Sequence, residues 1–227
     1  MKRIRWFNID CEGLPLSGLP GRLRRFEYAN DSGVGFRIQR ASKGTAEGTF
    51  IERFAVEEEV EDPFGKVLHF KRIEFRRVHF NLVATEPNLE VVDPPRSLKM
   101  FFSQLSAAMD HRLTVSQVEP RVAPWLTALE KEVGRLRVRM MRIADVSMSP
   151  SIHAEAIVQG GDSDVRNAVT KLLDGRSGQV ISASVTWRQG DETMACELTR
   201  QGAEYSEAHE DMVAPLLRQS LQLSLGK

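Results

Sequence analysis

The sequence predicts an α+β protein with two β-rich lobes, built mainly from antiparallel sheets with helices packed on one face. Three observations lead to this prediction. Alternating and aromatic-rich runs fill the first half of the chain, helical apolar spacing starts near residue 98, and the order strand, strand, helix occurs twice in the second half. The 227 residues are enough for one large domain or two small ones. We expect lobes at residues 1–112 and 113–227, the second with the order ββαββα.

Short runs of alternating polar and apolar residues indicate strands in the first half. Residues 3–9 alternate in this way, and turn-forming residues bound the next candidates at 34–40 and 49–60. The Pro- and Gly-rich segment 13–21 is expected to be a loop. In the longest candidate, residues 67–85, apolar residues recur at steps of both two and three, which predicts β-bulges or burial on both sides.

Helical spacing of apolar residues begins in the middle of the chain. Residues 98–109 follow the i, i+3, i+4 rhythm, and Ser97 precedes them as a candidate cap. A second helix is predicted over residues 120–133, with Gly134 at its end. Residues 113–118, between the two helices, are expected to form a short strand.

The second half shows clearer patterns than the first. Its periodicity changes from two to 3.6 and back, so strands and helices separate well. In chain order we expect strands at 135–147 and 152–159, a helix at 162–173, a hairpin at 179–188 and 192–200, and an amphipathic helix at 208–225.

Composition and charge limit the cellular setting. Lys plus Arg total 31 and Asp plus Glu total 31, so no uniform field attracts nucleic acid or an anionic membrane. The N-terminus lacks the apolar run of roughly 7–15 residues that a secretory signal needs, and no stretch of about 18 apolar residues exists. Cys11 and Cys196 are typical of reduced thiols, with one long-range disulfide as the alternative. We expect a cytoplasmic protein with no membrane partner.

The sequence holds few signals of catalysis. The five histidines show neither the helical spacing nor the cysteine partners that are typical of zinc sites. The segment 175–178 lacks the spacing of a nucleophile elbow. We therefore expect no cofactor, no metal site and no catalytic group made of adjacent residues. An enzyme whose site is assembled only by the fold is the third function class that we consider.

Charge is strongly segregated along the chain. Residues 41–65 hold two basic and seven acidic side chains, whereas residues 66–80 hold five basic and one acidic. Residues 135–144 carry four arginines and no acid. Positive side chains that are scattered in the sequence could therefore form a shared basic surface after folding.

The basic residues of the strand candidates define the predicted binding surface. Alternate residues of a strand project from the same face of a sheet. Three arginines of the 135–147 strand are alternate, while the long strand carries two arginines on one face and two basic residues on the other. The predicted nucleic-acid contacts are Arg135, Arg137, Arg139, Arg72 and Arg76, with Lys71 and Arg77 as secondary contacts.

Arginines about 7 Å apart on a pleated strand suit the phosphates of a nucleic-acid backbone. The lead prediction is a non-catalytic accessory protein that contacts DNA or RNA through these side chains. The alternative is a protein–protein adaptor or a subunit of a larger complex, including a homo-oligomer, because segregated charge and an apolar-faced terminal helix could dock a partner. Ion pairs across neighbouring strands would explain the same arginines structurally.

The order of elements, with the step Val118-Glu119-Pro120 between the halves, is loosely similar to that of DNA-binding exclusion proteins of temperate phages and bacterial antiphage accessory proteins. The likeness covers the layout alone, rests on no motif and assigns no residue. It implies a bacterial or phage defence setting for the nucleic-acid contact.

Overall fold

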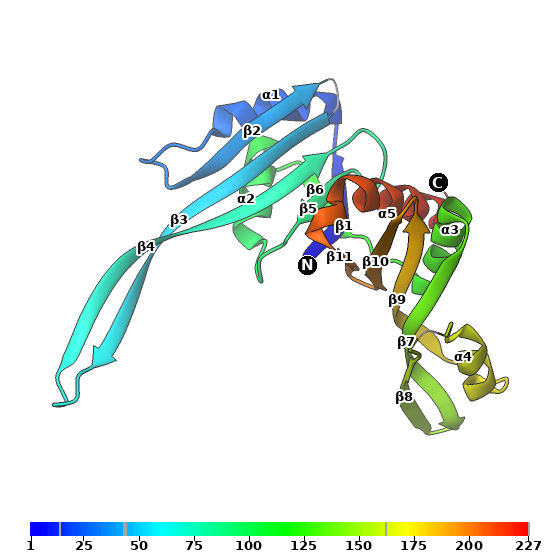
Figure 1. Cartoon of the computed structure of the whole chain (residues 1–227). Coiled ribbons are helices and arrows are strands. Elements are labelled where there is room, and N and C mark those ends of the chain that lie inside the picture. The colour runs from blue at the N-terminus through cyan, green and yellow to red at the C-terminus, as the bar shows by residue number, and fades with distance from the viewer. Residues whose placement is uncertain (14, 43–44, 162, 227) are drawn as a thin grey trace. The chain divides into compact units, whose positions relative to one another are not determined.

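A computed structural model describes residues 1–13, 15–42, 45–161 and 163–226. Its antiparallel strands and its helices confirm the predicted α+β class. The chain divides into two compact units, and each is described by itself (Figure 1). Trp6–Ser116 form the N-terminal unit, and Met1–Arg5 together with Gln117–Lys227 form the C-terminal unit. The predicted lobes, residues 1–112 and 113–227, stay a prediction.

The N-terminal unit contains a largely antiparallel sheet with the order β2-β3-β4-β5-β1, and β6 also pairs with β1. Only the part of β1 from Trp6 onward belongs to this unit. The strands are β1 (Lys2–Cys11), β2 (Val34–Ser42), β3 (Thr45–Glu61), β4 (Val67–Leu82), β5 (Leu89–Val92) and β6 (Leu113–Gln117).

The hairpin of β3 and β4 extends well beyond β2 (Figure 1). The two strands pair from Ala46↔Leu82 to Glu61↔Val67 without a register shift, so the bulges expected in residues 67–85 do not occur. Its distal part, residues 54–75, pairs with no third strand among the described residues. A two-stranded ribbon exposed on both faces needs no alternation of apolar and polar residues. This explains why apolar residues recur at steps of both two and three in residues 67–85.

Helices cover the core of the N-terminal unit. In α2 (Lys99–Ala108), the ring of Phe101 lies 5.5 Å from that of Phe80 and 6.2 Å from that of Phe36, between ring centroids. The prediction of a loop at residues 13–21 is wrong from Leu16 onward. These residues form a 3-10 turn (Leu16–Gly18) and α1 (Leu19–Leu23). Pro20 lies in the first turn of α1, where a missing N–H costs nothing. A further 3-10 turn, Arg24–Phe26, follows α1.

The C-terminal unit contains a sheet with the order β1-β11-β10-β9-β7-β8, in which Lys2–Ile4 of β1 pair with β11. The four-residue strand β11 was not predicted, because so short a segment carries no periodicity. The further strands are β7 (Leu136–Ser149), β8 (Ile152–Gln159), β9 (Gln179–Gln189), β10 (Glu192–Thr199) and β11 (Gly202–Tyr205).

Two helices cover one face of this sheet. α3 (Val122–Val133) contacts β9, β10 and α5 (Glu210–Ser224), and α5 contacts β11. The indole Nε1 of Trp125 donates a 3.0 Å hydrogen bond to the Oγ of Ser220, which ties the two helices together. The remaining helices of the unit are α4 (Arg166–Leu173) and a 3-10 turn at Glu207–His209.

Within the described residues, no helix has the length and apolar character needed to cross a membrane. The two cysteines, Cys11 and Cys196, are free and buried. Burial raises the pKa of both thiols, so both remain protonated near neutral pH and are poor nucleophiles.

Gly202 is required where β11 approaches β1. Its φ of +146° is a backbone conformation that L side chains rarely adopt. A Cβ atom built there would lie 1.9 Å from the carbonyl oxygen of Ile4. Any larger residue therefore forces β1 away from β11.

We expect Gly202→Ala to lower the free energy of unfolding by about 2–4 kcal/mol, through backbone strain and the clash with Ile4. Urea denaturation measures the change. Gly161→Ala is the control, since no atom lies within 4 Å of its built Cβ atom, and it should change stability by about 0.5 kcal/mol or less. Equal stability of the two variants would contradict this role of Gly202.

Candidate anion-binding site on the C-terminal unit

The first two arginines of the site are positioned by the end of a helix. α3 ends at Gly134, whose φ of +79° turns the chain, and Arg135 links the helix to β7. Arg137 is exposed between the buried residues Leu136 and Val138, as the alternation in the sequence predicts. Since Leu136 and Val138 pack into the core, the strand is anchored and Arg137 projects from the opposite face.

The register of the sheet brings polar residues from β9 and β10 beside these arginines. Arg137 lies opposite Thr186 of β9, and Arg188 of β9 lies opposite Thr193 of β10. Neighbouring strands are about 4.8 Å apart, so the side chains of these residues are close neighbours. The pairing of β7 with β9 thus joins segments that are distant in the sequence.

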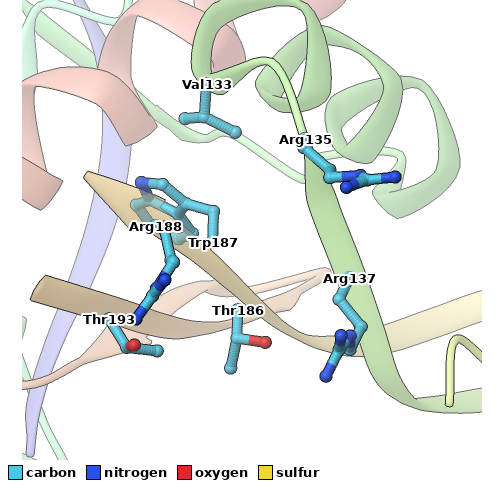
Figure 2. A pocket seen from close by; sticks show the side chains of 7 residues that line it. All are labelled: Val133, Arg135, Arg137, Thr186, Trp187, Arg188 and Thr193. Atoms are coloured by element: carbon cyan, nitrogen blue, oxygen red, sulfur yellow. The ribbon is translucent and has the colours of Figure 1, made fainter. Parts of the chain in front are cut away.

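Together these residues surround a cavity of about 500 Å³ (Figure 2). Figure 2 shows Arg137, Arg188 and the two threonines around its lower part, with Arg135 on the side of α3. Among the residues that the structure describes, the three guanidinium groups form no ion pair with a carboxylate. The lining residues are Val133, Arg135, Arg137, Thr186, Trp187, Arg188 and Thr193.

The cavity therefore combines three positive charges with hydroxyl groups and no lining carboxylate. Each guanidinium presents five N–H donors, and each hydroxyl can donate one more hydrogen bond. The indole nitrogen of Trp187 is buried in the core-facing row of Leu136 and Met194, so the donors of the cavity are the guanidinium and hydroxyl groups. This set of donors can bind an anion with several oxygen atoms, such as a phosphate group.

Arg139 differs from Arg135 and Arg137. The register between β7 and β9 shifts between Val138 and Met140, so Arg139 lies in a β-bulge and does not continue the regular alternation that the sequence predicted. It is exposed but does not line the cavity. Further along β7, Arg142 forms an ion pair with Glu155 of β8. The unpaired positive charge of β7 is therefore confined to its first part.

A network of charged groups holds the beginning of β7 in place. Arg166 donates hydrogen bonds to Asp164, to Glu130 at 2.6 Å and to the carbonyl oxygen of Leu136 at 3.2 Å. Asp164 also accepts a 3.1 Å hydrogen bond from the backbone N–H of Val138. The residues on both sides of Arg137 are thus fixed by side chains outside the cavity, which positions Arg137 without using its charge.

Opposing effects act on Asp164. Burial raises the pKa of its carboxyl, but the hydrogen bonds from Arg166 and from the backbone N–H of Val138 outweigh it, so the pKa lies below its usual value. Hydrogen bonds to Asp164 and Glu130 raise the pKa of Arg166, which stays charged at all accessible pH values. Arg166 is therefore a structural cation.

Most of the predicted hairpin residues have carboxylate partners. Lys71 lies 3.5 Å from Glu57, and Arg72 lies 2.9 Å from Glu58 and 2.7 Å from Glu74. These are nitrogen-to-oxygen distances. The hairpin therefore matches the acidic segment of β3 against the basic segment of β4, as expected for charge pairs on neighbouring strands.

The other two hairpin residues differ from each other. Arg76 lies 2.8 Å from Glu52, and its guanidinium carbon lies 5.1 Å from the ring centroid of Phe54. Arg77, opposite Ile51, has no ion pair among the described residues. The four predicted contacts of the hairpin belong to the N-terminal unit, and Arg135, Arg137 and Arg139 belong to the C-terminal unit.

Arg188, Thr186 and Thr193 are not among the predicted site residues. The predicted hairpin at 179–188 and 192–200 put Arg188 and Thr193 on neighbouring strands but did not give the register between them. The pairing of β9 with β7, which brings them to Arg137, is a long-range contact that no local pattern reports. No known protein family and no curated protein matches this sequence. The described residues contain no group of three or more His, Cys, Asp or Glu that could hold a metal ion.

We expect Asp164→Asn to lower the free energy of unfolding by about 1–2 kcal/mol at pH 7, because charge-assisted hydrogen bonds are lost. The folded-state pKa is depressed, so this stabilisation is present above the unfolded-state pKa of about 3.9 and disappears as the pH falls through the folded-state value. Denaturation at pH 7 and pH 3 should show the difference from wild type shrinking with acid. Asp174→Asn, at the exposed end of α4 and outside this hydrogen-bond network, is the control.

Proposed function

We propose that this protein is a non-catalytic accessory protein that contacts nucleic-acid phosphates through the arginines of its C-terminal unit. The observation that supports it is the cavity around which Arg135, Arg137 and Arg188 lie without carboxylate partners among the described residues. In this proposal the second lobe contacts the nucleic acid. Its order is ββαββα, with β11 added before the last helix. The setting we propose is cytoplasmic, in bacterial or phage defence.

The charge distribution supports a local contact. Net charge is zero, so long-range attraction is weak. A carboxylate partner compensates the charge of a guanidinium and so weakens its attraction for a phosphate, whereas Arg137 and Arg188 have no such partner among the described residues. Arginine also binds phosphate oxygens through two parallel hydrogen bonds, which lysine cannot do.

The proposal ranks the predicted contacts. Arg135 and Arg137 line the cavity, Arg139 is exposed nearby on β7, and Arg188 joins them. The ion-paired Lys71, Arg72 and Arg76 are secondary in this proposal, as is Arg77, because all four belong to the other unit. Backbone contacts of this kind set affinity and not sequence preference, so we expect binding that tolerates many sequences.

Removing two of the cavity arginines tests the proposal. In fluorescence anisotropy titrations with single-stranded and duplex oligonucleotides across a salt series, each phosphate contact contributes about 0.7–0.9 to the slope of log affinity against log salt. Arg137→Gln combined with Arg188→Gln should therefore reduce the slope by about 1.4–1.8 and weaken binding at every salt concentration.

The matched control is Arg142→Gln, which lies on the same strand but is ion-paired with Glu155. We expect it to leave the salt slope of the wild-type protein nearly unchanged. The proposal fails if the wild-type protein binds neither form of nucleic acid at low salt, or if the double variant binds with the wild-type slope.

A second candidate function is self-association through the distal hairpin, residues 54–75. Exposed apolar patches of this kind mark interaction surfaces in soluble proteins. Two hairpins packed face to face about a two-fold axis along the strands would lay the acidic strand β3 of each copy over the basic strand β4 of the other. This charge complementarity favours a second copy of the chain as the partner. The exposed apolar residues are Val60, Phe64, Val67, Leu68, Phe70, Ile73 and Phe75.

One face of the hairpin carries Val60, Leu68 and Phe70, because Val60 lies opposite Leu68 and Phe70 lies two residues further along β4. If this face joins two copies, Leu68→Ser with Phe70→Ser should weaken dimerisation at least about tenfold in sedimentation-equilibrium experiments, since two buried apolar contacts are lost. Ile73→Ser, on the opposite face, serves as the control. A wild-type protein that stays monomeric at high concentration contradicts this function.

A further inference from the structure

The arginines that line the cavity lie at one end of the open face of the C-terminal sheet. Arg188 and Thr193 form the row nearest to the β9–β10 turn, and Arg137 and Thr186 form the next row. On the same face, the following row has Glu197 of β10, which lies opposite Ser184 on one side and Glu204 of β11 on the other. One step along the strands from the cavity, the face therefore presents two carboxylates, with Arg3 of β1 opposite Glu204.

This arrangement is unsuited to a phosphate backbone that runs across the face of the sheet. An extended strand of nucleic acid carries one negative charge per nucleotide and would meet Glu197 and Glu204 after leaving the arginines. Further in the same direction, Arg142 of β7 lies opposite Ser182 and is ion-paired with Glu155. The basic surface thus accommodates one short anionic segment.

The cavity matches such a segment in size and in charge. Its volume of about 500 Å³ lies within the range of roughly 300–1,000 Å³ that is typical of pockets for small ligands, and a single nucleotide fits that range. Three lining arginines suit a group with more than one negative charge. A phosphate monoester carries about −1.5 to −2 at pH 7 and has three free oxygens, whereas an internal phosphodiester carries one charge.

We infer that the cavity binds the terminal phosphate monoester of a nucleic-acid chain, together with its last nucleotide. The inference rests on the proposed contact with nucleic acid and names the part of the chain that is bound. Arg137 and Arg188 neutralise the monoester from two adjacent strands, and the hydroxyl of Thr186 donates to a phosphate oxygen. The positive charge of Arg135, beside α3, adds to the attraction for the anion.

A set of oligonucleotides with one sequence and an internal fluorescent label tests this inference. The four probes carry a 5′-phosphate, a 3′-phosphate, hydroxyl groups at both ends, or no ends at all because they are circular. In anisotropy titrations, we expect one of the phosphorylated probes to bind at least about tenfold more tightly than the hydroxyl-ended and circular probes, which should bind alike. The phosphate position that gives the higher affinity identifies the end that enters the cavity.

Variants connect the preference to the cavity. Arg137→Gln and Arg188→Gln should each remove most of the preference for the phosphorylated end, and Thr186→Val, which has nearly the same shape, should reduce it severalfold. Arg142→Gln lies outside the cavity and should keep the full preference. A preference for phosphorylated ends that survives Arg137→Gln with Arg188→Gln would overturn the assignment to this cavity.

The remaining outcomes separate this inference from the proposed function. Equal binding of all four probes, lost in the arginine variants, would overturn end recognition and support nucleic-acid contact. Binding of no probe at low salt would overturn both. Adenosine monophosphate serves as a competitor. If it competes at the same concentration as the phosphorylated oligonucleotide, the cavity binds free nucleotides and the inference is overturned. Competition only at far higher concentration supports the inference.

Discussion

Whether an arginine on a strand already has a carboxylate opposite it decides what each half of this protein can bind. In the hairpin, β3 places glutamates against the basic residues of β4, so Arg72 and Arg76 compensate charges of the protein itself. On the C-terminal sheet, β9 and β10 place threonines beside Arg137 and Arg188. Hydroxyl groups do not neutralise a guanidinium, so that positive charge remains available to an external anion.

The rigidity of the strands around the cavity gives this charge a defined position. Leu136, Trp187 and Met194 form a buried row across β7, β9 and β10, directly beside the row that contains Arg137. Arg166 and Asp164 add hydrogen bonds to the backbone of β7 on both sides of Arg137. A site on strands that are anchored in this way loses less conformational entropy on binding than a site on a loop.

The distal hairpin presents a different physical problem. A long ribbon with free edges and exposed apolar side chains is prone to pair with other chains. Its charges oppose the pairing of like strands from two copies, because the acidic residues lie mainly on β3 and the basic residues mainly on β4. The two units thus carry different kinds of surface, one basic and concave, the other amphipathic and extended.

The sequence by itself determined what depends on neighbouring residues: the α+β class, the helix that ends at Gly134, and the exposure of Arg137 between two buried residues. Local patterns could not reveal α1, where Pro20 resembles a loop residue, or β11, which is too short for periodicity. Tertiary structure alone decided which arginines lack a carboxylate partner and which of them lie together. Arg72 meets its carboxylates on the hairpin, and Arg139 lies in a β-bulge. Arg188 lies near Arg137 only because of the register of β9 with β7. Strand register is a long-range property, set by the packing of buried rows across the sheet, and no local window of sequence contains it.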